Sequence, residues 1–211
     1  ASIIPFDSLA ENASFGLFKK ITTNLATIKN LIVNASFTIN TMVSGDKTIS
    51  ELNIGGICGE FAGVMENCVA NTDIIFDDSP SGAKISKLNI GGMVGKLTND
   101  TANGKISGFN ENLTIAQYSS KMSAKLTKNN TKNENNEINI GGVVGLIDFD
   151  GSDGDSNIKD LKVQTYILVG SVESGSVNLS KANVGGIAGK SEIKGVFNGN
   201  NLTISDVQVF P

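Results

Sequence analysis

The amino-acid sequence predicts an all-β protein, folded as a parallel β-solenoid of about five irregular rungs in the right-handed form. Three observations support this prediction: a seven-residue motif occurs four times, short segments with apolar periodicity follow each copy, and turn residues dominate the composition. Asn, Gly, Ser and Thr supply 84 of the 211 residues (25, 24, 21 and 14). These residues favour turns and disfavour long helices, so short strands joined by turns are expected.

The repeated motif predicts one corner in each rung. It reads NIGGICG at 53–59, NIGGMVG at 89–95, NIGGVVG at 139–145 and NVGGIAG at 183–189. Ile54 and Ile57 are three residues apart, so both point inward only if the chain turns between them. Gly55 and Gly56 stand at that point, and glycine tolerates both positive φ and close backbone approach. A degenerate copy of the motif, SFGLFKKI, occupies 14–21.

Strand-like segments follow and precede each motif. The following segments are 26–39, 63–76, 104–118, 156–169 and 195–210, which we align on Asn30, Asn67, Gly108, Asp160 and Asn198. In the fourth, the apolar stripe changes parity between Ile158 and Leu161, which predicts a bend or bulge. The preceding segments are 47–52, 83–88, 135–138 and 176–182.

The chain is expected to form a single domain, residues 1–211, because one unit of this kind cannot bury enough apolar surface to fold alone. Neighbouring units must supply the shared interior and the missing main-chain hydrogen bonds. Polar stretches predict loop insertions near 97–104, 127–137 and 148–157.

Composition disfavours several classes of function. All 17 basic residues are Lys and the net charge is −4, which is a poor match to nucleic acid. His is absent, so the commonest general base and zinc ligand are missing. No stretch reaches 18 consecutive apolar residues, so no membrane span is expected. We expect a non-enzymatic protein.

One part of the sequence is similar to a known repeat family. GGICGEF followed by GVMENCVANTDI resembles the GLUG-type repeat of bacterial surface adhesins and immunoglobulin A protease-like proteins. Gly55, Gly56, Ile57, Cys58 and Gly59 match its first element, and Gly63, Met65, Asn67 and Cys68 match its second. The resemblance implies an extracellular β-solenoid that forms part of a long adhesin or fibre.

Two cysteines occur, Cys58 and Cys68. One interpretation is two small buried apolar side chains. The other is a disulfide that closes a short loop, which requires an oxidising compartment and a Cα separation below about 7 Å.

Acidic residues gather at one place, Asp148, Asp150, Asp153 and Asp155, with Asn157 and Asp160 nearby. Their oxygen atoms would suit a hard cation such as Ca²⁺, which is the only cofactor we consider. The spacing does not fit an EF-hand loop. The alternatives are a solvated acidic turn and a carboxylate pair for glycoside cleavage.

Seven Asn-x-Ser/Thr triplets begin at Asn12, Asn34, Asn99, Asn112, Asn129, Asn178 and Asn201. In a eukaryotic secreted protein they would be acceptors for N-linked glycans.

The sequence predicts a structural or adhesive protein of a cell surface or extracellular filament. Expected partners are copies of itself, stacked end to end, or the rest of a larger parent chain, and host or matrix glycans and proteins. The competing interpretation is a β-helix that binds or acts on polysaccharide. Because only Tyr118 and Tyr166 supply tyrosine rings and Trp is absent, platforms for sugar stacking are scarce.

Overall fold

The structure, a computed structural model, confirms a β-solenoid of parallel strands. It describes residues 2–3, 10–23, 25–40, 47–78, 84–98, 105–107, 120–128, 137–149, 156–170, 181–193 and 202–210. Within these residues every regular element is a strand, and every strand pairing is parallel. The handedness of the solenoid stays a prediction.

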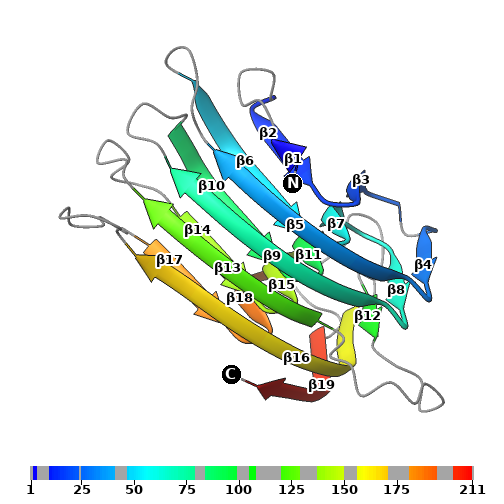
Figure 1. The fold of residues 1–211 in the computed structure, drawn as a ribbon. Coiled ribbons are helices and arrows are strands. Elements are labelled where there is room, and N and C mark those ends of the chain that lie inside the picture. Colours follow the sequence, from blue (N-terminus) through cyan, green and yellow to red (C-terminus); the bar gives the residue numbers. More distant parts are fainter. Residues whose placement is uncertain are drawn as a thin grey trace.

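Five successive turns of the chain form the rungs (Figure 1). Rung 1 consists of β2 (Asn12–Phe15), β3 (Phe18–Ile21), β4 (Thr27–Lys29) and β5 (Ile32–Asn40). Rung 2 consists of β6 (Thr48–Gly55), β7 (Cys58–Phe61), β8 (Val64–Glu66) and β9 (Val69–Asp78). Rung 3 consists of β10 (Lys84–Gly91), β11 (Val94–Thr98), β12 (Lys105–Ser107) and β13 (Ser120–Lys128). Rung 4 consists of β14 (Glu137–Gly141), β15 (Val144–Phe149) and β16 (Ser156–Gly170). Rung 5 consists of β17 (Lys181–Gly185), β18 (Ala188–Ile193) and β19 (Leu202–Phe210), and β1 (Ser2–Ile3) pairs with β5 ahead of rung 1.

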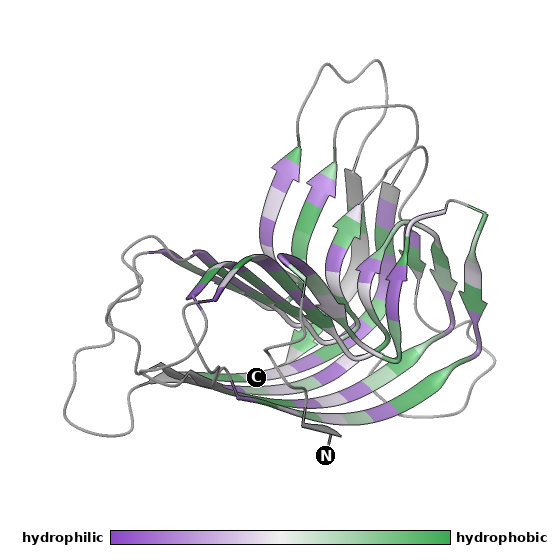
Figure 2. Cartoon of the chain, turned by 90° about the horizontal axis from the view of Figure 1, so that it is seen from above, coloured by the Kyte–Doolittle hydropathy of each residue, from purple (hydrophilic) through white to green (hydrophobic). Residues whose placement is uncertain are grey.

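The rungs build three sheets. The first sheet has the order β17-β14-β10-β6-β2, and the second has the order β18-β15-β11-β7-β3. The third sheet has a short arm (β4, β8, β12 and the start of β16) and a long arm (β1, β5, β9, β13 and the rest of β16). The last strand, β19, pairs along both parts of β16. Figure 2 shows the second sheet rising from the first, while the long arm runs beneath the first. Each predicted loop begins inside a strand, because β11 extends to Thr98, β13 to Lys128 and β15 to Phe149. The middle portions of these loops lie outside the described residues.

The four copies of the motif stack in register and form the corner between the first and second sheets. Asn53, Asn89, Asn139 and Asn183 are register partners, and so are the glycines that follow them. The degenerate copy at 14–21 also aligns, since Ser14 pairs with Asn53, but its corner has one residue fewer than the corners of the four full copies. The predicted corner is therefore confirmed.

Glycine is needed at the corner because backbones pack closely there, and not because the backbone adopts a positive φ. None of the glycines of the motif has a φ in the left-handed region. A Cβ on Gly91 or Gly92 would lie closer than 3.0 Å to carbonyl oxygens of the corner, on its own rung or on rung 4. A Cβ on Gly95 would lie equally close to the backbone of Asn53 and Ile54 in rung 2. Real Cβ atoms do not occupy such positions, so each rung needs glycine to approach its neighbours.

A second corner separates the short arm from the long arm. Asn30, Asn67 and Asp160 occupy it with φ values of 55°, 53° and 55°. Asn and Asp tolerate this left-handed conformation better than most other residues. The bend predicted between Ile158 and Leu161 is confirmed, and both side chains are buried. The alignment of the fifth unit on Asn198 is wrong, because Lys159 pairs with Ser205 and Leu161 with Val207, which places Asp206 opposite Asp160.

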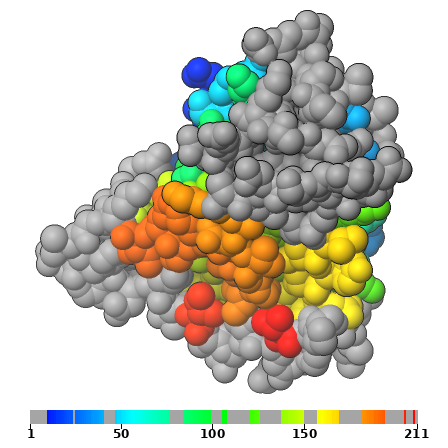
Figure 3. Space-filling model, turned by 90° about the vertical axis from the view of Figure 1, so that its left-hand side faces the viewer, coloured from blue at the N-terminus to red at the C-terminus, as the bar shows by residue number. Residues whose placement is uncertain are grey.

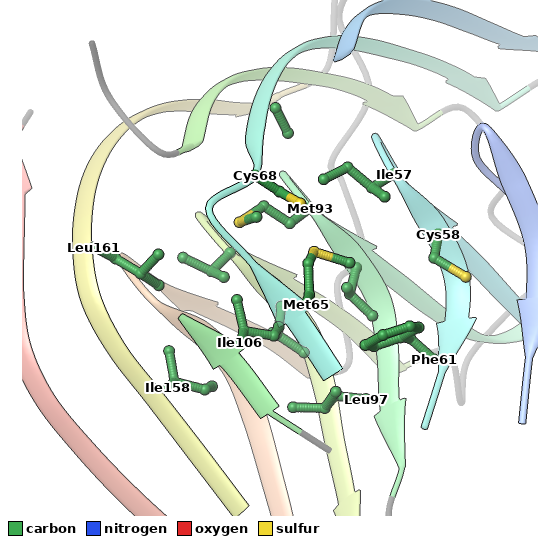
Figure 4. Packing of buried hydrophobic residues seen from close by; sticks show 14 of the residues in the cluster. Ile57, Cys58, Phe61, Met65, Cys68, Met93, Leu97, Ile106, Ile158 and Leu161 are labelled. Carbon is green, nitrogen blue, oxygen red and sulfur yellow. The ribbon is translucent and has the colours of Figure 1, made fainter. Parts of the chain in front are cut away.

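Two apolar clusters fill the interior. One lies between the first sheet and the long arm and includes Ile54, Ile90 and Ile140, stacked in register. The other lies between the second sheet, the short arm and the start of the long arm (Figure 4). At their boundary, the second glycine of each motif approaches a long-arm side chain, as Gly92 does with Ser120. The Ser120 hydroxyl also donates to the carbonyl of Gly142 at 2.6 Å.

Gly92→Ala should lower the free energy of unfolding by about 3 kcal/mol, because its Cβ meets backbone and a buried hydroxyl that cannot both move. Gly186→Ala is the matched control at the same motif position in rung 5. There the Cβ meets only the side chain of Val209, so the loss should stay below about 1 kcal/mol. Urea unfolding measures both values, and equal losses would contradict this account of the corner.

Candidate functional site

The first residue of the motif forms a ladder of buried amides along the solenoid. The Nδ2 of Asn89 donates to Oδ1 of Asn53 at 2.7 Å, Asn139 donates to Asn89 at 2.8 Å, and Asn183 donates to Asn139 at 2.8 Å. Asn53, Asn89 and Asn139 are almost completely buried. Each amide in the middle therefore both donates and accepts within the ladder, which satisfies polar groups that would otherwise be costly to bury.

Charged residues of the first and second sheets meet on the outer side of this corner. Lys96 in the second sheet lies 3.1 Å from Glu51 in the first sheet and 3.1 Å from Asp148 on the next rung. Burial by itself would lower the pKa of Lys96, but the two carboxylates outweigh it and raise that pKa above its ordinary value. One lysine thus connects rungs 2, 3 and 4.

A second group continues the network toward rung 5. Lys190 lies 2.8 Å from Glu137 and also pairs with Glu192, which lies 3.7 Å from Lys87. Burial would raise the pKa of Glu137, but hydrogen bonds from Lys190 and Asn139 hold that pKa below its ordinary value. The hydrogen bonds to Glu137 and Glu192 raise the pKa of Lys190.

The charges of this network alternate from rung 2 to rung 5 in the first sheet and from rung 1 to rung 3 in the second sheet. In the first sheet the register partners are Glu51, Lys87, Glu137 and Lys181. In the second sheet Lys20, Glu60 and Lys96 follow one another, and Lys20 lies 3.0 Å from Glu60. Opposite charges on adjacent strands favour this register, and a shift by one residue would separate them.

The acidic cluster predicted to bind Ca²⁺ is described only in part. Asp148 lies on β15, where Lys96 pairs with its carboxylate. Asp150, Asp153 and Asp155 lie outside the described residues. Asn157 and Asp160 lie on β16, and Asp160 is 3.8 Å from Lys159. Among the described residues there is no group of three potential metal ligands, and calcium binding stays a prediction.

The structure has Cys58 and Cys68 as free, buried thiols rather than as the alternative disulfide. Figure 4 shows the two side chains apart from one another in the second apolar cluster. Each thiol donates to a main-chain carbonyl two residues away, Cys58 to Glu60 at 3.0 Å and Cys68 to Glu66 at 3.3 Å. Burial raises the pKa of Cys58 to about 12 and raises the pKa of Cys68 as well, so neither is an activated nucleophile.

Two of the seven predicted glycan acceptors are described. Asn12 and Asn34 are exposed, and the side-chain oxygen of Asn34 accepts a hydrogen bond from Asn71 at 2.8 Å. The other five, Asn99, Asn112, Asn129, Asn178 and Asn201, lie outside the described residues. Glycan occupancy stays a prediction.

Large exposed apolar side chains concentrate on the two end rungs. In the described residues, eight of eleven belong to rung 1 (Leu17, Phe18, Leu25, Ile32) or rung 5 (Val184, Ile193, Ile204, Val209). The other three, Ile75, Tyr166 and Leu168, lie on the long arm. Figure 3 shows the rung 5 end, where red atoms of β19 reach the surface beside the orange segment of β17 and β18. In the described part of the chain, the two ends are therefore the main apolar surface.

Sequence analysis missed the amide ladder and the charge network. Signals for both are present: Asn opens every motif, and a charged residue of alternating sign stands two positions before it, at Glu51, Lys87, Glu137 and Lys181. These Asn and charged residues can be recognised as interacting partners only when the copies of the motif are aligned in register.

Comparisons with known proteins return nothing similar. The sequence matches no protein-family model, and neither a curated protein nor a solved structure matches it. Within the described residues, no helix has the length and apolar character needed to cross a membrane.

Asn89→Ala should lower the free energy of unfolding by about 2–4 kcal/mol, because it leaves an acceptor on Asn53 and a donor on Asn139 buried without a partner. Asn183→Ala is the matched control at the end of the ladder and should cost less, about 1–2 kcal/mol, since it leaves only the acceptor on Asn139 without its partner, beside a partly exposed site. Urea unfolding compares the two variants. Equal losses would show that the ladder does not act as a buried network.

Cys58→Val should leave stability at pH 7 within about 1 kcal/mol, because Val94 and Val144 fill the register positions above it. The pKa of Cys58 is raised by folding from 9.0 to about 12, so the protonated thiol stabilises the fold below pH 9 and this contribution is lost as pH rises toward 12. Between pH 9 and about 11, the variant should therefore gain stability relative to the unsubstituted protein. Urea unfolding across that range measures the difference, and a constant difference would contradict the burial of the thiol.

Proposed function

We propose that this protein is a non-enzymatic structural or adhesive β-solenoid of a cell surface or extracellular filament, acting as a module of a longer column. The observation that supports it is the use of the polar side chains around the corner. The buried amides hydrogen-bond to one another, and Lys96, Lys190 and their carboxylates neutralise one another. Charges that are paired with one another from rung to rung favour a structural role over a catalytic one.

The dimensions of the fold also support a structural role. Five parallel rungs at about 4.8 Å per rung give a body roughly 24 Å long. Both apolar clusters extend from rung to rung, so the column is stiff without disulfides or metal in the described part. The resemblance of residues 53–76 to the GLUG-type repeat of surface adhesins favours an extracellular location.

A second candidate is carbohydrate binding, and the outer face of the long arm favours it. Tyr166 is 64% exposed there, with Leu168 two residues further along the same strand. An exposed aromatic ring on a flat sheet can stack on a sugar ring. The face offers a single tyrosine among the described residues, so we rank this function below the structural one.

Antibodies raised against the purified protein should label intact, unpermeabilised cells of the source organism or their extracellular filaments. Removal of surface proteins with an external protease should abolish the signal, and a cytoplasmic protein should remain intact as the control. Labelling that appears only after permeabilisation would contradict the proposed location.

On a glycan array the protein should bind weakly and without selectivity, because one exposed tyrosine makes a poor sugar platform. Specific binding that disappears with Tyr166→Ala, but persists with Lys121→Ala on the same arm, would favour the second candidate instead. Release of reducing ends from a polysaccharide would contradict the non-enzymatic proposal.

A further inference from the structure

The end of the solenoid at rung 5 leaves the apolar interior open. Val184 continues the column of Ile54, Ile90 and Ile140, yet Val184 is 53% exposed whereas Ile140 is fully buried. The same contrast holds in the third sheet, where exposed Ile204 and Val209 lie next to buried Ile158 and Val163. These residues have apolar side chains like those of the core, and among the described residues no rung covers them on one side.

The hydrogen-bonding groups of the corner face the same side. In each earlier rung, corner N–H groups donate to carbonyls of the following rung, as Ile57 does to Met93 at 2.9 Å and Val143 to Ile187 at 2.9 Å. In rung 5 the equivalent N–H groups belong to Gly186 and Ile187. The amide ladder has the opposite polarity: each Asn donates to the preceding Asn, so Oδ1 of Asn183 is the acceptor that a following Asn would use.

Glycines of rung 5 keep space for a following rung. A Cβ on Gly141 or Gly142 would collide with the backbone of rung 5. A Cβ on Gly185 would meet only Ala188 of its own rung, and a Cβ on Gly186 would meet only the side chain of Val209. Rung 5 therefore has the glycines that an inner rung needs, although no further rung contacts them in the described structure.

Rung 1 does not have the matching surface. The third glycine of the motif, as in Gly59, Gly95 and Gly145, packs against the backbone of the preceding rung. In rung 1 this position is Lys19, because Phe18 pairs with Cys58 and Lys20 with Glu60. Stacked in register on rung 5 of another copy, the Cβ of Lys19 would collide with the backbone at Asn183 and Val184.

Charge disfavours the same contact. Lys20, Glu60, Lys96, Leu146 and Lys190 are successive register partners in the second sheet. An in-register stack of rung 1 on rung 5 would therefore place Lys20 directly opposite Lys190, and like charges on adjacent strands are destabilising. Rung 1 also has one corner residue fewer than the motif of rung 5.

We infer that the open face of rung 5 is a docking site for one further β-rung with the motif Asn-x-Gly-Gly-x-x-Gly, and that the protein's own rung 1 is excluded from it. This inference rests on the proposed structural function and names the partner of that surface. The partner supplies an Asn to the ladder, carbonyls to the corner, and a glycine where rung 1 has Lys19.

Thiol labelling of Val184→Cys in the full chain tests the inference. The side chain at 184 is half exposed, whereas native Cys58 and Cys68 are buried and provide little background. Four proteins are compared: the chain alone, and the chain followed after Pro211 by a second copy of residues 129–170, by the same copy with Gly145→Lys, or by a second copy of residues 10–40. The lysine reproduces Lys19 of rung 1 at the matched position. Lys121→Cys on the exposed face of β13 serves as the labelling control in all four.

The added 129–170 segment should slow labelling at position 184 by about tenfold or more, because the thiol can then react only when the new rung opens. The Gly145→Lys segment and the 10–40 segment should leave labelling unchanged, and Lys121→Cys should react equally throughout. Labelling that is equally fast in all four proteins overturns the docking site. Protection by either control segment overturns the selectivity for glycine. A cytoplasmic location would contradict the proposed function without altering this result.

Discussion

The structure depends on the absence of Cβ atoms at the corner between the first and second sheets. At Gly91, Gly92 and Gly95 a methyl group would occupy space already taken by backbone of the same or neighbouring rungs. Because these contacts are between main chains, they fix the position of one rung on the next more tightly than side-chain packing could. The close approach also brings successive Asn amides within 2.7–2.8 Å of one another.

Once the backbone register is set, polar groups enforce it. A slip by one residue in the first sheet would break the buried amide ladder and leave its donors and acceptors without partners. It would also separate opposite charges, because Glu51 would then lie opposite Ser86 or Leu88 instead of Lys87. The ion pairs of Lys96 and Lys190 are mostly buried, and the cost of removing these charges from water offsets much of their attraction, so the network mainly discriminates between registers.

The repeat, the corner and the parallel strands could be predicted from the sequence because they depend on glycine pairs and apolar spacing, which are local signals. The alignment of the fifth unit could not, because both Asn198 and Asp206 are residues that accept a left-handed corner. Pairing of Ile204 with Ile158 and of Val209 with Val163 decides between them, and this pairing exists only in three dimensions. The state of Cys58 and Cys68 was left open for the same reason: ten residues of separation do not say whether two strands turn their thiols toward each other.

The same glycines make the solenoid polar. An inner rung must offer room to both neighbours, and rungs 2 to 5 retain the glycines for this, while rung 1 replaces one of them with Lys19. The two ends of the interior column differ as well, since Phe15 at the rung 1 end is 8% exposed and Val184 at the rung 5 end is 53% exposed. Unlimited head-to-tail growth requires two complementary ends. Rung 1 complements rung 5 neither in its glycines nor in its charges, so head-to-tail stacking of identical copies is disfavoured, and a rung that docks on rung 5 has to supply a glycine where rung 1 has Lys19.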